Sequence, residues 1–177
     1  MLKLSLLLSC LCAAGSSLAR SRPAKPEFLN LTAIGASDGR STIECWQLGP
    51  FDKSSQPGTS GTRFLKLGDI STGTYSVLPP DFDGGRHNAP AFQYVFFASG
   101  LAHITLPNGT DEAWVHGGKH GLIIAADTKE MSKHGHITRY PGKDNTVALQ
   151  IPIKEGSDLK HKMLHKGACT EKEMSGI

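Results

Sequence analysis

The chain has 177 residues, of which 38% are hydrophobic and 20% are charged, and its formal net charge is +3. This length suits one domain with its own hydrophobic core. A net charge this small gives no indication of binding to nucleic acid or to a membrane surface.

The first 19 residues have the features of a cleaved secretory signal. Lys3 gives a short basic start, an apolar run extends from Leu4 to Ala14, and small residues precede a cleavage point after Ala19. No later apolar segment is long enough to span a bilayer, so we expect a secreted, extracellular protein that does not associate with a membrane. Residues 20–40 are expected to form a leader and an N-terminal arm, with residues 20–27 flexible.

Two cysteines follow the signal segment, and two sequons agree with export. Cys45 and Cys169 could form a disulfide that closes a long loop and contributes about 4 kcal/mol. Two separate thiols are the alternative, because the sequence does not show the Cα separation. Asn-x-Thr sequons at Asn30 and Asn108 predict N-glycosylation, and Asn108-Gly109 is equally typical of a hairpin turn.

Short apolar segments separated by Gly, Pro, Asn and Asp predict an all-β domain over residues 41–156. A first short strand is expected at 43–48, followed by a loop at 51–62. The number and spacing of the short apolar segments favour an antiparallel sandwich or barrel. The remaining expected strands are 63–67, 74–78, 92–98, 101–106, 112–115, 121–126, 135–140 and 146–153.

One helix is expected in the C-terminal segment, residues 157–177. Ser157-Asp158 can cap it, Leu159 and Met163 fall near helical spacing, and Gly167 can end it. The lysines and histidines of this segment are expected to form a solvated helix face rather than an anion site.

Six of the eight histidines lie between His87 and His136. Strand alternation places His87, Ala89 and Gln93 on one face, and it places His134 and His136 on one face as well. If the two strands are neighbours, these side chains could converge on a metal ion. The alternatives are a buried polar network of His87, Gln93 and His136 with water, or an exposed arrangement without function.

The spacing His87-x-Ala89-(x)3-Gln93-(x)6-Gly100 resembles the first motif of the cupin superfamily, and "SKHGHITRY" resembles the second motif, with His136 as its histidine. The resemblance covers residues 63–153, and the chain is similar to small, secreted, single-domain cupins of fungal type. It implies a single jelly-roll β-barrel with a site for a metal at its mouth.

The departures from the cupin motifs bear on the chemistry. Ala89 replaces a histidine ligand, Gln93 replaces the carboxylate, and Lys133 replaces a glycine. Losing the anionic ligand weakens the attraction for a divalent ion. Asp127 is the nearest carboxylate, but nothing in the sequence fixes its direction. His134 could complete a set with His87, Gln93 and His136, which would suit one divalent transition metal such as Zn, Fe, Cu, Ni or Mn.

The resemblance implies a metal-assisted enzyme that oxidises, decarboxylates or isomerises a small oxygenated or aromatic metabolite. His87 and His136 are the expected catalytic residues, and either could act as a general base without a metal. Tyr94 is expected in the substrate pocket. The alternative is a non-catalytic ligand-binding protein or host-interaction effector that uses the same pocket, and open sheet edges could support a homodimer.

Overall fold

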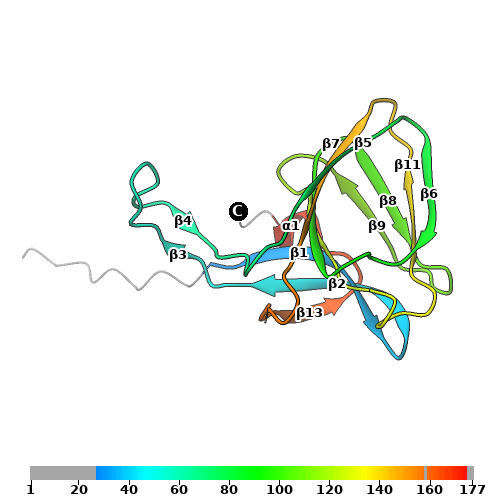
Figure 1. The fold of residues 1–177 in the computed structure, drawn as a ribbon, viewed down its shortest axis with the longest axis horizontal. Helices are drawn as coiled ribbons and strands as arrows, with labels where there is room; N and C mark the ends of the chain where they lie inside the picture. Colours follow the sequence, from blue (N-terminus) through cyan, green and yellow to red (C-terminus); the bar gives the residue numbers. More distant parts are fainter. Residues whose placement is uncertain (1–26, 158, 175–177) are drawn as a thin grey trace, which may run out of the picture.

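The computed structural model describes residues 27–157 and 159–174, so the predicted signal segment 1–19, leader residues 20–26 and the last three residues of the tail lie outside it. The described chain consists almost entirely of β-strands, with one short helix (Figure 1). The all-β class is therefore confirmed.

Two sheets form the body of the molecule. The first contains, in spatial order, β13 (Lys162–Lys166), β2 (Arg40–Leu48), β1 (Leu29–Ser37), β10 (Leu122–Ala125), β7 (Gln93–Ser99), β12 (Thr146–Pro152) and β5 (Thr74–Leu78). The second contains β6 (Phe82–His87), β11 (His136–Tyr140), β8 (Leu101–Thr105) and β9 (Glu112–His116). All neighbouring strands pair antiparallel except β1 and β10, which pair in parallel.

The hydrogen-bonded strands of the described chain do not close into a barrel. The seven-stranded sheet ends at β13 and β5, and the four-stranded sheet ends at β6 and β9. Edge strand β5 carries the exposed side chains of Tyr75 and Val77. The homodimer expected from open sheet edges stays a prediction.

Strands β3 (Asp52–Lys53) and β4 (Arg63–Phe64) form a separate two-stranded arm. The arm extends away from the body, at the left of Figure 1. The arm includes most of the loop expected at 51–62. Of the strand expected at 63–67, the first two residues pair, with β3.

Each face of the seven-stranded sheet carries its own hydrophobic core. On β10, Ile123 and Ala125 pack in the cluster between the two sheets, whereas Ile124 packs in the cluster on the opposite face. The same alternation along β7 sends Phe97 between the sheets and Tyr94 to the far side. Such two-sided burial follows from the period of two along a strand.

Two segments differ from the sequence-based expectation. Residues 29–37, assigned to the N-terminal arm, form β1, which pairs with β2 over its whole length. The helix expected after Ser157 is wrong, because Lys162–Lys166 forms β13 and pairs with β2. Asp158, its expected cap, lies outside the described residues.

The physical reason for the second error is tertiary pairing, which overrides weak helical spacing. Cys169 is bonded to Cys45 of β2, which holds the preceding segment beside that strand. The helix of this region, α1 (Glu171–Met174), lies farther along and begins with a capping box. Thr170 Oγ accepts from the Glu173 amide, while Glu173 Oε2 accepts from the Thr170 amide.

Candidate functional site

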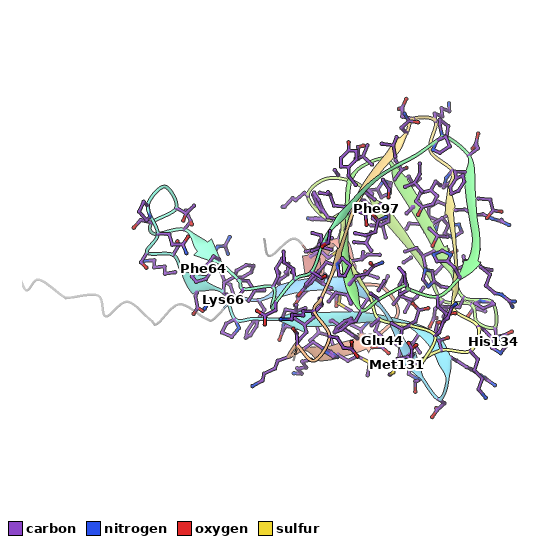
Figure 2. The ribbon with its side chains drawn as sticks, viewed as in Figure 1. Glu44, Phe64, Lys66, Phe97, Met131 and His134 are labelled. Atoms are coloured by element: carbon purple, nitrogen blue, oxygen red, sulfur yellow. A yellow bond between two sulfur atoms is a disulfide. The ribbon has the colours of Figure 1, made fainter. Side chains whose placement is uncertain are left out.

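A cavity of about 520 Å³ lies between the two sheets. Its wall is mainly apolar and includes Phe97, which lies inside the body of the molecule in Figure 2. The polar residues of the wall are Thr74, Ser76, His87, Gln93, His136, Thr138, Tyr140 and Gln150. A few polar groups converging on an apolar hollow are typical of small-molecule sites.

The structure brings His87 and His136 together on neighbouring strands. His87 ends β6 and lies directly opposite His136, the first residue of β11. Their ring centroids are 4.5 Å apart, with the planes inclined by 61°. Gly135 makes this approach sterically accessible, because its φ is +64° and a Cβ there would overlap the His87 carbonyl.

Asp127, which follows β10, fixes the orientation of the His136 ring. Its carboxylate is fully buried. Oδ2 accepts hydrogen bonds from Ser41 Oγ at 2.6 Å and from His136 Nδ1 at 2.8 Å. The contact places the Nδ1 proton of His136 toward Asp127 and leaves Nε2 as the ring atom available for chemistry.

Further hydrogen bonds hold the connection between β10 and β11 in place. Ser132 Oγ lies 2.8 Å from Ser41 Oγ and accepts from the Gly135 amide. The side-chain amide of Asn88, through Nδ2, donates to the backbone carbonyls of Asp127 and Ser132, at 3.0 and 2.8 Å. Sequence reasoning missed Ser41, Asn88 and Ser132, since no motif marks them. The position of Asp127 directly after a buried strand was the available signal for its role.

His87 lies at the mouth of the cavity, with part of its side chain open to solvent. Its Nδ1 lies 3.1 Å from the Gly85 carbonyl oxygen. Burial of the ring lowers the pKa of His87 below its ordinary value, and the neighbouring His136 lowers it further. The ring is therefore predominantly neutral near pH 7 and can accept a proton.

Gln93 is the third predicted residue that faces the cavity. It begins β7, is 5% exposed, and its side chain makes no hydrogen bond to another described residue. Because a buried polar group without a partner is costly, this amide is available for a bound molecule or water.

Two predicted site residues lie elsewhere. His134 is exposed, faces an outer hollow beside Lys133, and does not line the inner cavity (Figure 2). It precedes Gly135 in a bend rather than in β11, so strand alternation does not apply to it. The prediction that it shares the face of His136 is wrong.

The prediction for Tyr94 is also wrong. Its neighbour Gln93 faces the cavity, so Tyr94 points to the opposite side of the sheet, where it is fully buried in the second core. The Tyr94 hydroxyl has no hydrogen-bond partner in the described structure, and burial raises the pKa of Tyr94 to about 12.

Without His134, the inner cavity offers a metal two imidazoles and one amide oxygen. None of the three offers a negatively charged ligand atom, and Asp127 is occupied by Ser41 and His136. This set does not match the three imidazoles and one carboxylate of a cupin metal site. In the described chain, one group of three His, Cys, Asp or Glu side chains lies close enough to share an ion, namely Cys45, His165 and Glu173.

The sulfur of Cys45 is not available as a thiolate ligand in that group. Cys45 is bonded to Cys169, with a Cα–Cα distance of 4.7 Å. The predicted disulfide is thus present in the structure, which contradicts the alternative of two separate thiols.

The sequons differ in accessibility. Asn108 is exposed in the turn between β8 and β9, where a glycan meets open solvent. Asn30 lies in β1, and its Nδ2, the atom that would carry a glycan, donates to the Glu173 carbonyl at 3.1 Å. N-glycosylation stays a prediction, and a glycan at Asn30 would have to replace this bond.

Comparison with family models, with curated proteins and with solved structures finds no match for this chain. In the part of the chain that the structure describes, no helix has both the length and the apolar character needed to cross a membrane.

Proposed function

We propose that this chain is a secreted, cupin-like jelly-roll protein and an enzyme of the isomerase or lyase kind. Its substrate would be a small, largely apolar, oxygenated or aromatic molecule, and catalysis would proceed by proton transfer in the inner cavity. The single observation that carries this proposal is the buried Asp127–His136 pair, which ends in an imidazole on the cavity wall beside His87.

In the proposed mechanism, His136 is the general base. The Asp127 carboxylate holds the Nδ1 proton, keeps the ring in one orientation, and stabilises the imidazolium that forms when Nε2 takes a proton from the substrate. Neutral His87, whose ring centroid is 4.5 Å from that of His136, can relay the proton to solvent at the cavity mouth. Gln93 would bind a substrate oxygen, since its amide has no partner in the described chain.

The motifs that resemble cupins support the fold part of the proposal. Gly100, the motif glycine, connects β7 to β8 with a φ of +86°, and a Cβ there would overlap Thr146. The disulfide is a feature common in extracellular proteins and supports secretion. The proposed proton transfer uses the side chains of Asp127, His136 and His87 alone, so it is written without a metal.

A generic substrate for positioned bases tests the catalytic proposal. Ring opening of 5-nitrobenzisoxazole requires one base to remove its C–H proton while the N–O bond breaks. We expect a faster reaction with the protein than in buffer, and a loss of about 10²–10⁴-fold in His136→Gln. The control is His116→Gln, since His116 is exposed and does not line this cavity. Equal rates for His136→Gln and the unsubstituted protein would contradict the proposal.

The second candidate is a non-catalytic ligand-binding protein or effector. The largely apolar wall and the unpartnered Gln93 amide favour it independently of any proton transfer. Stoichiometric binding of an aromatic ketone such as 2-acetylnaphthalene, together with no acceleration of the base-dependent reaction, would select this function.

A further inference from the structure

A second, outer cavity adjoins the inner one at His87. It measures about 630 Å³, and His87, Ala89 and Pro90 line both cavities. The two cavities are therefore neighbours at the segment that begins with His87 and ends with Pro90. The other residues around the outer cavity are Arg86, Asn88, Lys129, Glu130, Lys133 and His134.

The outer cavity carries an excess of positive charge. Arg86, Lys129 and Lys133, here called the basic rim, are opposed by one carboxylate, that of Glu130. No salt bridge joins a basic-rim side chain to an acidic one within residues 27–157 and 159–174. Hydrogen bonds from the Thr128 side chain and from its own backbone amide, and to a smaller extent the charge of Lys129, lower the pKa of Glu130. Arg86 and Lys133 thus contribute most of the uncompensated charge.

The basic rim is attached to a fixed part of the backbone. Lys133 follows Ser132, whose hydroxyl and carbonyl are held by Ser41 and Asn88, and its amide donates to the Gly39 carbonyl at 3.0 Å. Arg86 lies in β6, where it pairs with Ile137 of β11. Cations on a rigid support at the mouth of a low-dielectric hollow concentrate their field on whatever enters it.

The two neighbouring cavities differ in chemistry. The inner cavity is mainly apolar and ends at the imidazoles and Gln93, whereas the outer cavity is polar and cationic. A molecule that satisfies both would have a compact apolar body and one anionic group. A neutral molecule would leave the basic rim without a partner, and a cation would be repelled.

We propose that the natural ligand is a small amphipathic carboxylate, with its body in the inner cavity and its anionic group at Arg86 and Lys133. This inference rests on the proposed function, because it assigns the substrate class of the same cavity. His87 lines both cavities, so the carbon atoms next to a carboxylate at the basic rim would lie beside its imidazole.

A matched pair of probes tests the charge preference. The naphthalene ring is the same in 2-naphthoate and 2-acetylnaphthalene, and only the first carries a charge. Isothermal titration calorimetry at pH 8, with His87 neutral, should show at least about tenfold tighter binding of the naphthoate at low salt. The preference should fall as salt is raised, because partly exposed charges are screened.

The variant Arg86→Gln/Lys133→Gln should reduce the preference to about twofold or less and leave the affinity for 2-acetylnaphthalene unchanged. The control variant, Lys53→Gln/Lys66→Gln, removes one exposed lysine from β3 and one from the segment after β4. Neither lysine lines the two cavities, and Lys66 lies well apart from the cavity residue Phe97 (Figure 2). The control variant should keep the full preference. Equal affinity of the unsubstituted protein for the two probes, or an undiminished preference in Arg86→Gln/Lys133→Gln, would overturn the inference.

A cavity-filling variant separates failure of the inference from failure of the proposed function. Ser76 faces the inner cavity on β5, whereas its neighbour Val77 is exposed on the other face. Ser76→Phe should abolish binding of both probes, and Val77→Phe should preserve it. If both probes bind equally and Ser76→Phe abolishes both, the carboxylate preference is wrong and the cavity site stands. If neither probe binds, or if binding survives Ser76→Phe, both proposals are wrong.

Discussion

Three histidine–carboxylate pairs of the described chain have the same 2.8 Å separation, and the pair at the cavity differs in its surroundings from the pair in the C-terminal segment. The third, His103–Glu112, joins β8 to β9. His136 and Asp127 join the two sheets at the cavity, with side chains 5% and 0% exposed. His165 of β13 and Glu173 of α1 lie in the C-terminal segment, with side chains 39% and 33% exposed. The contact distance alone does not distinguish the two pairs.

The difference lies in what surrounds each pair. Asp127 also accepts from Ser41, and the free edge of the His136 ring faces an apolar hollow. The carboxylate of Glu173 is shared with Thr170 at the start of α1, and His165 Nδ1 lies 2.8 Å from the Lys166 carbonyl oxygen. The first pair presents its imidazole to a cavity that can hold a ligand, whereas the second is part of a helix cap.

The largest expected effect is the loss of the disulfide, which anchors the C-terminal segment. The variant Cys45→Ala/Cys169→Ala should lose about 4–5 kcal/mol of unfolding free energy, because the bond spans 124 residues of sequence and restricts the unfolded chain. Urea unfolding measures this loss, and reduction of the unsubstituted protein should reproduce it. A loss below about 1 kcal/mol would mean that noncovalent contacts, the His165–Glu173 pair among them, hold the segment.

The next largest effect is expected at the cavity pair. Asp127→Ala should lower the unfolding free energy by about 3–5 kcal/mol, because it leaves His136 and Ser41 buried without their partner. Urea unfolding at pH 7 measures it. The matched control is Glu173→Ala, which removes the exposed pair and should cost far less. Similar losses in the two variants would contradict the contrast between the regions.

Much of the strand pattern could be predicted from sequence, because alternation and turn residues are local signals. The expected strand at 74–78 coincides with β5, and the expected strand at 101–106 differs from β8 by one residue. Alternation also placed His87 and Gln93 at the cavity. It did not anticipate β13, whose strand state depends on pairing with distant β2 and on Cys169.

The errors at the site have a similar origin. Gln93 and Tyr94 are adjacent in a strand, so they could not both face the cavity, and the resemblance to a motif gave no reason to choose Tyr94. His134 was treated as part of a strand that begins two residues later. The role of Asp127 depends on Ser41, 86 residues earlier in the chain, and no local pattern reports such a contact.

A smaller effect concerns the charge of His87 at the cavity mouth. We expect an NMR titration of its ring protons to give a pKa below 6.5, because burial and then His136 disfavour the imidazolium. His136→Gln should raise this pKa without restoring 6.5, since burial is the larger cause. With the folded pKa depressed, the contribution of His87 to stability is present above pH 6.5 and is lost as the pH falls through the folded pKa. A pKa at or above 6.5 in the unsubstituted protein would remove the argument for a neutral His87.

The smallest expected effect is that of Glu173→Gln in the C-terminal segment. Hydrogen bonds from the Thr170 amide and hydroxyl, and then from His165, lower the pKa of Glu173 from 4.5 to about 2. The stabilisation is therefore present above about pH 4.5 and disappears as the pH falls through 2. At pH 6 the variant should lose less than about 1 kcal/mol, because water screens a partly exposed pair. Urea unfolding of both proteins at pH 6 and pH 2 should show the two curves converging at the lower pH. A gap that persists at pH 2 would show that Glu173 acts through packing rather than through its charge, and the helix-cap interpretation of this pair would then be wrong.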